Sequence, residues 1–172
     1  EGKFTIWVDA LMKDQEIWED FEYGEKTLTW TPVNVNGAFQ FNLVGQGYNG
    51  MPSLKSGTAI RLAWHEDTDG AEIKSYMPEP LDISAWNAVK IRCALSKGSP
   101  PMNVSLWMFD GKNGSLAVSE PVNSITEWTE VIHDLSAHRD KVNMKHITEM
   151  GVVMHEYTGN AGAIYLDRIE YR

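Results

Sequence analysis

The fold is decided by a strand-like stretch near the end of the sequence, Ala163-Ile164-Tyr165-Leu166-Asp167-Arg168-Ile169-Glu170-Tyr171. Apolar residues recur at every second position, which indicates a β-strand, and Asp167 places a carboxylate within it. A second acidic group, Asp20-Phe21-Glu22, lies where the globular body begins. If the first and last strands pair, three carboxylates meet at one edge. This arrangement predicts a closed all-β domain with a cation near its seam, and a binding module rather than a catalyst.

Period-two alternation recurs along most of the chain. The clearest segments are residues 58–65, 88–95, 103–109, 129–135, 150–155 and 163–171, with weaker candidates at 39–44 and 4–8. Turn-forming pairs such as Asn36-Gly37 and Asp110-Gly111 lie between the segments. Short strands separated by frequent turns are typical of sandwiches and barrels. We therefore predict an all-β fold, an antiparallel two-sheet β-sandwich of jelly-roll type.

The chain has little helical character and no internal linker. Residues 10–21 resemble a helix weakly, and residues 136–145 are expected to hold a short helical turn. A length of 172 residues suits one domain with a full core. We assign residues 16–172 to the sandwich and residues 1–15 to a leading strand or the remnant of a linker.

Composition excludes several classes of partner. The net charge is −9, so no surplus of lysine or arginine is available to displace the counterions of nucleic acid or to bind an anionic membrane. No apolar run reaches the length of about 18 residues that a transmembrane helix needs. The single cysteine, Cys93, is in phase with apolar neighbours and is expected to be a small buried hydrophobe. The absence of an intrachain disulfide is compatible with the secreted or cell-surface location that we expect.

The chain contains seven tryptophans, a large number for its length. Trp64 and Trp86 are in phase with core residues, whereas the phase of Trp107 is opposite to that of the core set. An aromatic ring outside the core offers a flat face to a ligand. We predict five ligand-binding residues: Trp107, Trp30, Tyr76, His155 and Tyr157.

The order and spacing of several segments resemble one known group of domains. The segments are Asp20-Phe21-Glu22 and residues 57–64 (GTAIRLAW), 80–91 (PLDISAWNAVKI), 128–131 (WTEV), 147–152 (ITEMGV) and 164–169 (IYLDRI). Together they resemble the β-jelly-roll carbohydrate-binding modules of bacterial polysaccharide-degrading enzymes, above all families eleven and twenty-seven. The resemblance covers about residues 19–171.

This resemblance implies a non-catalytic module within a larger multidomain protein. It would bind a polysaccharide of the β-glucan or mannan type in an aromatic-lined groove on a concave sheet face, and so target an attached enzyme. The resemblance also implies a structural calcium ion, held by Asp20 or Glu22 and by Asp167. Carboxylate oxygens are the hard ligands that calcium prefers.

Two other functions remain open. The same sandwich could be a structural or interaction domain of a bacterial surface assembly, without a sugar groove. It could also be a small glycoside hydrolase or lyase, which would need two carboxylates across the scissile bond. Neither Glu19-Asp20-Phe21-Glu22 nor Glu66-Asp67-Thr68-Asp69-Gly70 resembles such a pair on an inward strand face, and no Gly-x-Ser-x-Gly nucleophile elbow is present. We therefore expect no catalytic residues.

Overall fold

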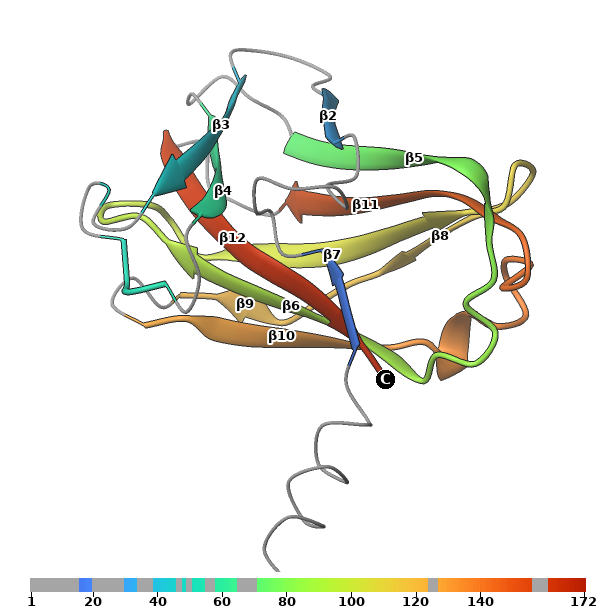
Figure 1. The fold of residues 1–172 in the computed structure, drawn as a ribbon. Coiled ribbons are helices and arrows are strands. Elements are labelled where there is room, and N and C mark those ends of the chain that lie inside the picture. Colours follow the sequence, from blue (N-terminus) through green and yellow to red (C-terminus); the bar gives the residue numbers. More distant parts are fainter. Residues whose placement is uncertain are drawn as a thin grey trace, which may run out of the picture.

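Two antiparallel sheets packed face to face make up the described part of the chain, as predicted. The computed structural model describes residues 16–19, 30–33, 39–45, 48, 51–54, 58–64, 71–123, 127–155 and 161–172. Within these residues, sheet A has the strand order β10-β6-β12-β4-β3, with β1 paired to β12, and sheet B has the order β2-β5-β11-β7-β8, with β9 paired to β7. In Figure 1 the red β12 of sheet A runs diagonally across the strands of sheet B, so the two sheets are visible as separate layers.

The strands lie close to the alternating segments of the sequence. Their bounds are β1 Glu16–Glu19, β2 Trp30–Val33, β3 Phe39–Gly45, β4 Thr58–Trp64, β5 Ala71–Leu81, β6 Ala88–Leu95, β7 Met102–Phe109, β8 Gly114–Ala117, β9 Pro121–Val122, β10 Thr129–Asp134, β11 Ile147–His155 and β12 Gly162–Tyr171. A 3-10 turn, η2, spans Ser136–His138, where a short helical turn was expected. The weaker candidate strand at residues 4–8 lies outside the described residues.

The longest strand, β5, was not predicted. It contains Pro78 and Pro80, which lower the strand signal because proline cannot donate a ladder hydrogen bond. Both prolines fall between the pairs Glu149↔Tyr76 and Ile147↔Leu81, where the register between β5 and β11 shifts. The strand therefore accommodates the prolines at an irregularity in its pairing.

The core lies between the two sheets. On β7 every inward side chain is fully buried, namely Met102, Val104, Leu106 and Met108. Cys93 is also fully buried, and burial raises the pKa of its thiol to about 12, so it acts as the small hydrophobe that was expected. No helix in the described part of the chain is long and apolar enough to span a membrane.

A β-bulge changes the phase of β12. The register with β6 shifts between Leu166 and Arg168, so that Ile169 joins Leu166 in the core between the sheets. The sequence pattern placed Ile169 on the same side as Asp167, and this was wrong because an extra residue in one strand reverses the alternation that follows it.

The first and last strands of the sheet are paired, as the sequence indicated. β1 pairs with the end of β12, with Glu16 opposite Tyr171 and Glu19 opposite Ile169. The two strands meet beside the C-terminus (Figure 1). Residues 16–19 therefore form a strand, and the weak helical pattern of residues 10–21 was misleading there, because ladder pairing with β12 outweighs local propensity. Residues 1–15 lie outside the described residues.

A buried aspartate joins the β7–β8 turn to the loop before β11. The carboxylate of Asp110 accepts backbone hydrogen bonds from Asn113 at 2.6 Å, Asn143 at 2.7 Å and Lys112 at 2.9 Å. The bonds from Asn113 and Asn143, followed by that from Lys112, hold the pKa of this carboxyl well below its ordinary value. Three N–H donors on one ionised acceptor fix this end of sheet B.

Candidate functional site

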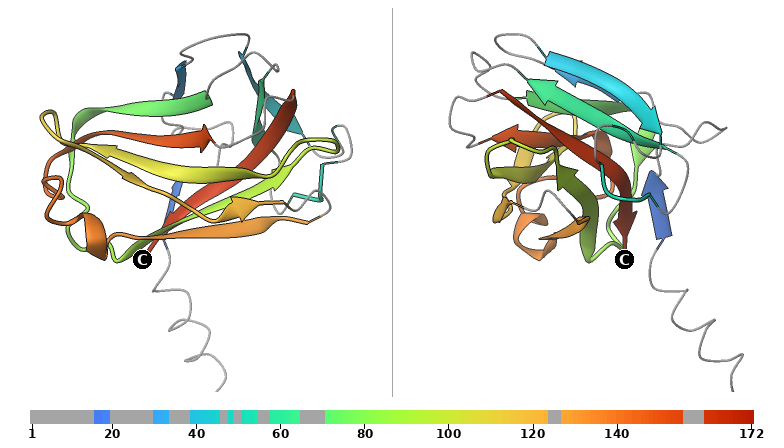
Figure 2. Two further views of the ribbon diagram at one scale, coloured as in Figure 1. Left: turned by 180° about the vertical axis from the view of Figure 1, so that it is seen from behind. Right: turned by 90° about the vertical axis from the view of Figure 1, so that its left-hand side faces the viewer.

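The outer face of sheet B carries a continuous group of aromatic and charged side chains. This face consists of the side chains that point away from the core on β5, β11, β7 and β8. Seen from behind in Figure 2 (left), these strands follow one another across the sheet. The register sets two neighbouring rows across the strands: Tyr76, Glu149 and Phe109 in one, and Lys74, Gly151 and Trp107 in the other.

Trp107 and Phe109 form the aromatic part of the outer face. Their ring centroids are 6.3 Å apart with an interplanar angle of 13°, an offset arrangement that leaves both rings partly exposed. Tyr76, which is 55% exposed, lies on the same face. Together the three rings provide an apolar surface on which a flat molecule could stack.

Glu149 holds the orientation of Trp107. The indole Nε1 donates a hydrogen bond to Glu149 Oε1 at a distance of 2.5 Å. Glu149 is only 9% exposed, so this bond is shielded from water on most sides. A hydrogen bond to a charged acceptor is stronger than a neutral one, and this bond fixes the ring of Trp107 in one orientation.

Lys74 links the charges of the outer face to its aromatic ring. Its Nζ is 3.0 Å from Glu149 Oε1 and 3.3 Å from Glu72 Oε1, and it lies 5.2 Å from the centroid of the Trp107 ring. Burial lowers the pKa of Lys74, but the hydrogen bonds and charges of Glu149 and Glu72 outweigh it, so the pKa lies above the ordinary value. Lys74 is therefore a firmly charged cation beside the indole.

Two glycines make room for this arrangement. A Cβ atom at Gly151 would lie 2.8 Å from the Ile73 carbonyl oxygen and 3.1 Å from Lys74 Cγ, so only glycine lets Lys74 cross β11. A Cβ atom at Gly114 would lie 2.1 Å from the ring atom Cη2 of Trp107. The indole therefore lies directly over the backbone of β8.

His155 lies one strand from Ser105 on the same face. Its Nε2 is hydrogen-bonded to Ser105 Oγ at 2.6 Å, and both residues are brought together by the pairing of β11 with β7. The imidazole and the hydroxyl add polar groups beside the aromatic surface. Tyr157, also predicted as a ligand-binding residue, lies outside the described residues.

The structure brings together three of the predicted ligand-binding residues, Trp107, Tyr76 and His155. Trp30 is different: it starts the edge strand β2, but its side chain is 8% exposed and packs in the core. It therefore offers no stacking surface, because the inward phase of β2 buries it. Trp64 and Trp86 are buried, as their phase indicated, and Trp86 stacks on Tyr171.

Sequence reasoning did not identify Lys74, Glu72 or Glu149. Glu72 and Lys74 lie on β5, which was not predicted as a strand, and Glu149 lies at the start of β11, before the segment that the pattern marked. The alternation of Ile73, Ser75 and Met77 with Glu72, Lys74 and Tyr76 was a signal for β5, and the prolines that follow obscured it.

The predicted calcium ligands are only partly described. Asp20 and Glu22 lie outside the described residues. Asp167 is 1% exposed, and its Oδ2 is 2.9 Å from Arg92 Nη1, so a guanidinium already supplies the positive charge beside it. No cluster of three or more His, Cys, Asp or Glu side chains suited to a metal ion is found within the described residues.

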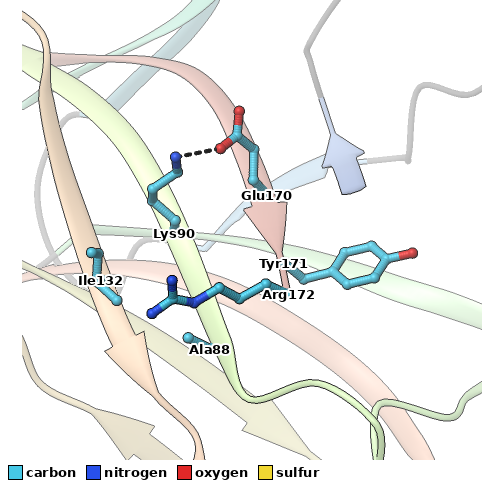
Figure 3. A pocket seen from close by; sticks show the side chains of 6 residues that line it. All are labelled: Ala88, Lys90, Ile132, Glu170, Tyr171 and Arg172. Carbon is cyan, nitrogen blue, oxygen red and sulfur yellow. Dashed lines mark ion pairs between the residues drawn. The ribbon is translucent and has the colours of Figure 1, made fainter. Parts of the chain in front are cut away.

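A small cavity lies on the outer surface of sheet A. It has a volume of about 30 Å³ and lies beside the ion pair of Lys90 and Glu170, whose charged atoms are 2.6 Å apart. Figure 3 shows this pair with Ile132 and the last two residues around the cavity. A space of about one water molecule is too small for a sugar ring.

Larger cavities, of about 310 Å³ and 390 Å³, lie beside Arg61 and Trp64 of sheet A and between residues 118–122 and 129–132. The outer face of sheet B is the candidate binding surface because it combines partly exposed aromatic rings with fixed polar groups.

Comparisons with known proteins show what the fold is similar to. No protein-family model matches the chain, and no curated protein sequence matches it. The fold is similar to that of the family 11 carbohydrate-binding module of Clostridium thermocellum solved with a β-1,3-1,4-mixed-linked tetrasaccharide, with 16% identity, a TM-score of 0.63, and coverage of 91% of this chain and 94% of that chain.

Two further solved structures share the fold. The CBM22-1 xylan-binding domain of Paenibacillus barcinonensis has 12% identity and a TM-score of 0.57, with 92% of this chain and 95% of that chain covered. The K2 cleaved adhesin domain of Lys-gingipain has 17% identity and a TM-score of 0.59, with 92% and 98% covered. The resemblance found in the sequence is thus confirmed for the fold: the chain has the β-sandwich architecture found in carbohydrate-binding modules.

Proposed function

We propose that this protein is a non-catalytic carbohydrate-binding module that binds a polysaccharide of the β-glucan or mannan type on the outer face of sheet B. One observation carries the proposal: the partly exposed ring of Trp107 is held in place by Glu149, beside Phe109 and on the same face as Tyr76. A sandwich needs no aromatic cluster on a solvent-facing sheet for its own stability, because such a face is ordinarily polar.

The binding mechanism follows from the chemistry of the face. A sugar ring has a face of C–H groups, which packs on an aromatic ring, and a rim of hydroxyl groups, which bind carboxylate, imidazole and hydroxyl side chains. The outer face of sheet B supplies both kinds of partner, the latter through Glu149 and through His155, whose Nε2 is bonded to the buried Ser105 hydroxyl. The contacts are few and open to water, so we expect an affinity in the micromolar range or weaker. The module would act outside the cell and target an attached enzyme to its polysaccharide.

The positions of the acidic residues support a non-catalytic role. A glycoside hydrolase holds two carboxylates on either side of the scissile bond. On the outer face of sheet B, Glu72 and Glu149 instead bind the same ammonium group, that of Lys74. Lys74 therefore occupies the space between them that a glycosidic bond would need.

The proposal is tested by affinity electrophoresis against a panel of soluble polysaccharides that includes mixed-linkage β-glucan and galactomannan. We expect retardation by at least one of them, and Trp107→Ala should abolish it without changing the melting temperature by more than a few degrees. The control is Ile132→Ala, because Ile132 is an exposed apolar residue on sheet A, away from the proposed face. Retardation that survives in Trp107→Ala would contradict the assignment of the face. A reducing-sugar assay on the bound polysaccharides should detect no turnover.

A second candidate function is an interaction domain of a cell-surface protein. The similarity in fold to the adhesin domain of Lys-gingipain favours it. In that case the outer face of sheet B would bind a protein, and no polysaccharide of the panel would retard the wild-type chain.

A structural calcium ion at the seam of β1 and β12 stays part of the proposal. β1 ends at Glu19 opposite Ile169, two residues from Asp167 along β12, which supports a site in this region. The Arg92–Asp167 ion pair is the observation that weighs against it.

A further inference from the structure

Glu149 has one carboxylate oxygen that its protein partners leave to a ligand. Both contacts that the described residues make with it, from Trp107 Nε1 and Lys74 Nζ, go to Oε1. Glu149 lies between Tyr76 and Phe109 in its row of the outer face, so its carboxylate belongs to the same row as two rings on which a sugar would stack. An ionised carboxylate is an acceptor only, and the groups that it would bind are therefore hydroxyl donors.

The charges at the centre of this face do not cancel. Lys74 brings one positive charge to two carboxylates, those of Glu72 and Glu149, which leaves a net charge of −1 on the three side chains. Because Lys74 crosses β11 over the bare backbone of Gly151, the three charges lie at the middle of the face and not at its rim. A ligand that carries the same charge as the face is repelled by it. Charge at a binding surface therefore contributes more to specificity than to affinity.

We propose that Glu149 determines the specificity of this face: its free carboxylate oxygen accepts hydrogen bonds from the hydroxyl groups of an uncharged glycan, and the net negative charge that it shares with Glu72 and Lys74 rejects glycans bearing carboxylates or sulfates. This inference rests on the proposed function and names the ligand class of the same site. Glu149 thus both positions Trp107 and selects ligands by their charge.

The geometry supplies a matched pair of variants. Glu149→Gln and Glu72→Gln each remove one negative charge beside Lys74, but only Glu149 contacts Trp107 and lies between the aromatic rings. The amide oxygen of the glutamine can still accept the hydrogen bond from Trp107 Nε1, so the indole should keep its orientation. Near-ultraviolet circular dichroism and the melting temperature check this for both variants.

The probes are mixed-linkage β-glucan and galactomannan, each used unmodified and after carboxymethylation. Wild type should bind at least one unmodified polysaccharide and should bind its carboxymethylated form at least about tenfold more weakly. Glu149→Gln should lose about tenfold in affinity for the unmodified form, the usual effect of losing a charged hydrogen-bond acceptor. Glu72→Gln should keep that affinity within about twofold, since Glu72 makes no contact with Trp107 in the structure. Both variants should discriminate less against the carboxymethylated form.

The outcomes separate this inference from the proposed function. If wild type binds an unmodified polysaccharide and Glu149→Gln binds it equally well, the role of Glu149 is wrong and the proposed function stands. Discrimination that is unchanged in both variants likewise overturns the selection by charge. If wild type binds neither unmodified polysaccharide while Trp107 stays in its observed environment, both proposals are wrong.

Discussion

Lowering the pH from 7 to 5 should destabilise this protein mainly through His133, the more deeply buried of the two histidines that lie buried in the described part of the chain. It lies on β10 with its side chain in the core and is 2% exposed. Burial is the main cause that lowers its pKa to about 4; the positive charge of His138 adds to the effect, and a hydrogen bond to the Val104 backbone opposes it. In the unfolded chain the pKa of a histidine is about 6.5. The unfolded state therefore binds a proton more readily than the folded state.

The sign and size of the effect follow from this difference. Above pH 6.5 both states are neutral at His133 and no stability is lost. As the pH falls below 6.5, protons bind to the unfolded chain first, so the free energy of unfolding declines until the folded-state pKa near 4 is reached. At 1.36 kcal/mol per pKa unit, the loss is about 2 kcal/mol at pH 5 and about 3 kcal/mol at pH 4. Carboxylates have ordinary pKa values near 4, so they contribute little to the change in the free energy of unfolding above pH 5.

The assay is urea unfolding followed by tryptophan fluorescence at pH 7 and pH 5. His133→Leu removes the titrating group and keeps an apolar side chain of similar size, so its free energy of unfolding should change by about 2 kcal/mol less than that of wild type between the two pH values. His133→Gln serves as a second variant if the leucine repacks the core. The control is His146→Gln, since His146 is exposed on the loop before β11. If the free energy of unfolding of both His133 variants falls between pH 7 and pH 5 by as much as that of wild type, the argument from burial is refuted.

Three further predictions concern the binding face, a turn and the proposed metal. Gly114→Ala should weaken polysaccharide binding at nearly unchanged stability, because the added methyl group displaces Trp107 from its position over β8; affinity electrophoresis checks this, and unchanged retardation would show that the ring position does not matter. Asp110→Asn should lower the melting temperature at pH 7, because the neutral amide is a weaker acceptor for three backbone N–H groups. Since the folded-state pKa of Asp110 is depressed, the difference from wild type should shrink as the pH falls below about 3.9, and a difference independent of pH would contradict the argument. Removing calcium with a chelator should lower the melting temperature if an ion binds near Asp167, since an ion bound only by the folded state stabilises it; an unchanged melting temperature after dialysis against chelator would rule that ion out.

Much of the fold could be predicted because each sheet buries one face. A strand with one buried face must alternate, and β6, β7 and β10 lie within one residue of the predicted segments. The same rule predicted that Trp64 and Trp86 point inward and that Trp107 points outward. These properties depend on neighbours two residues away along the chain, so the sequence alone contains them.

The tertiary structure decided the rest of the binding face. Whether Lys74 reaches Glu149 and Trp107 depends on the register of β5 against β11 and of β11 against β7, which joins residues more than thirty positions apart. The bulge in β12 that moves Ile169 into the core, and the inward turn of Trp30 at the edge of sheet B, depend on such pairings as well. Alternation along a strand is a local property of the chain, whereas the site is made by strand register, which is set only when the sheets assemble.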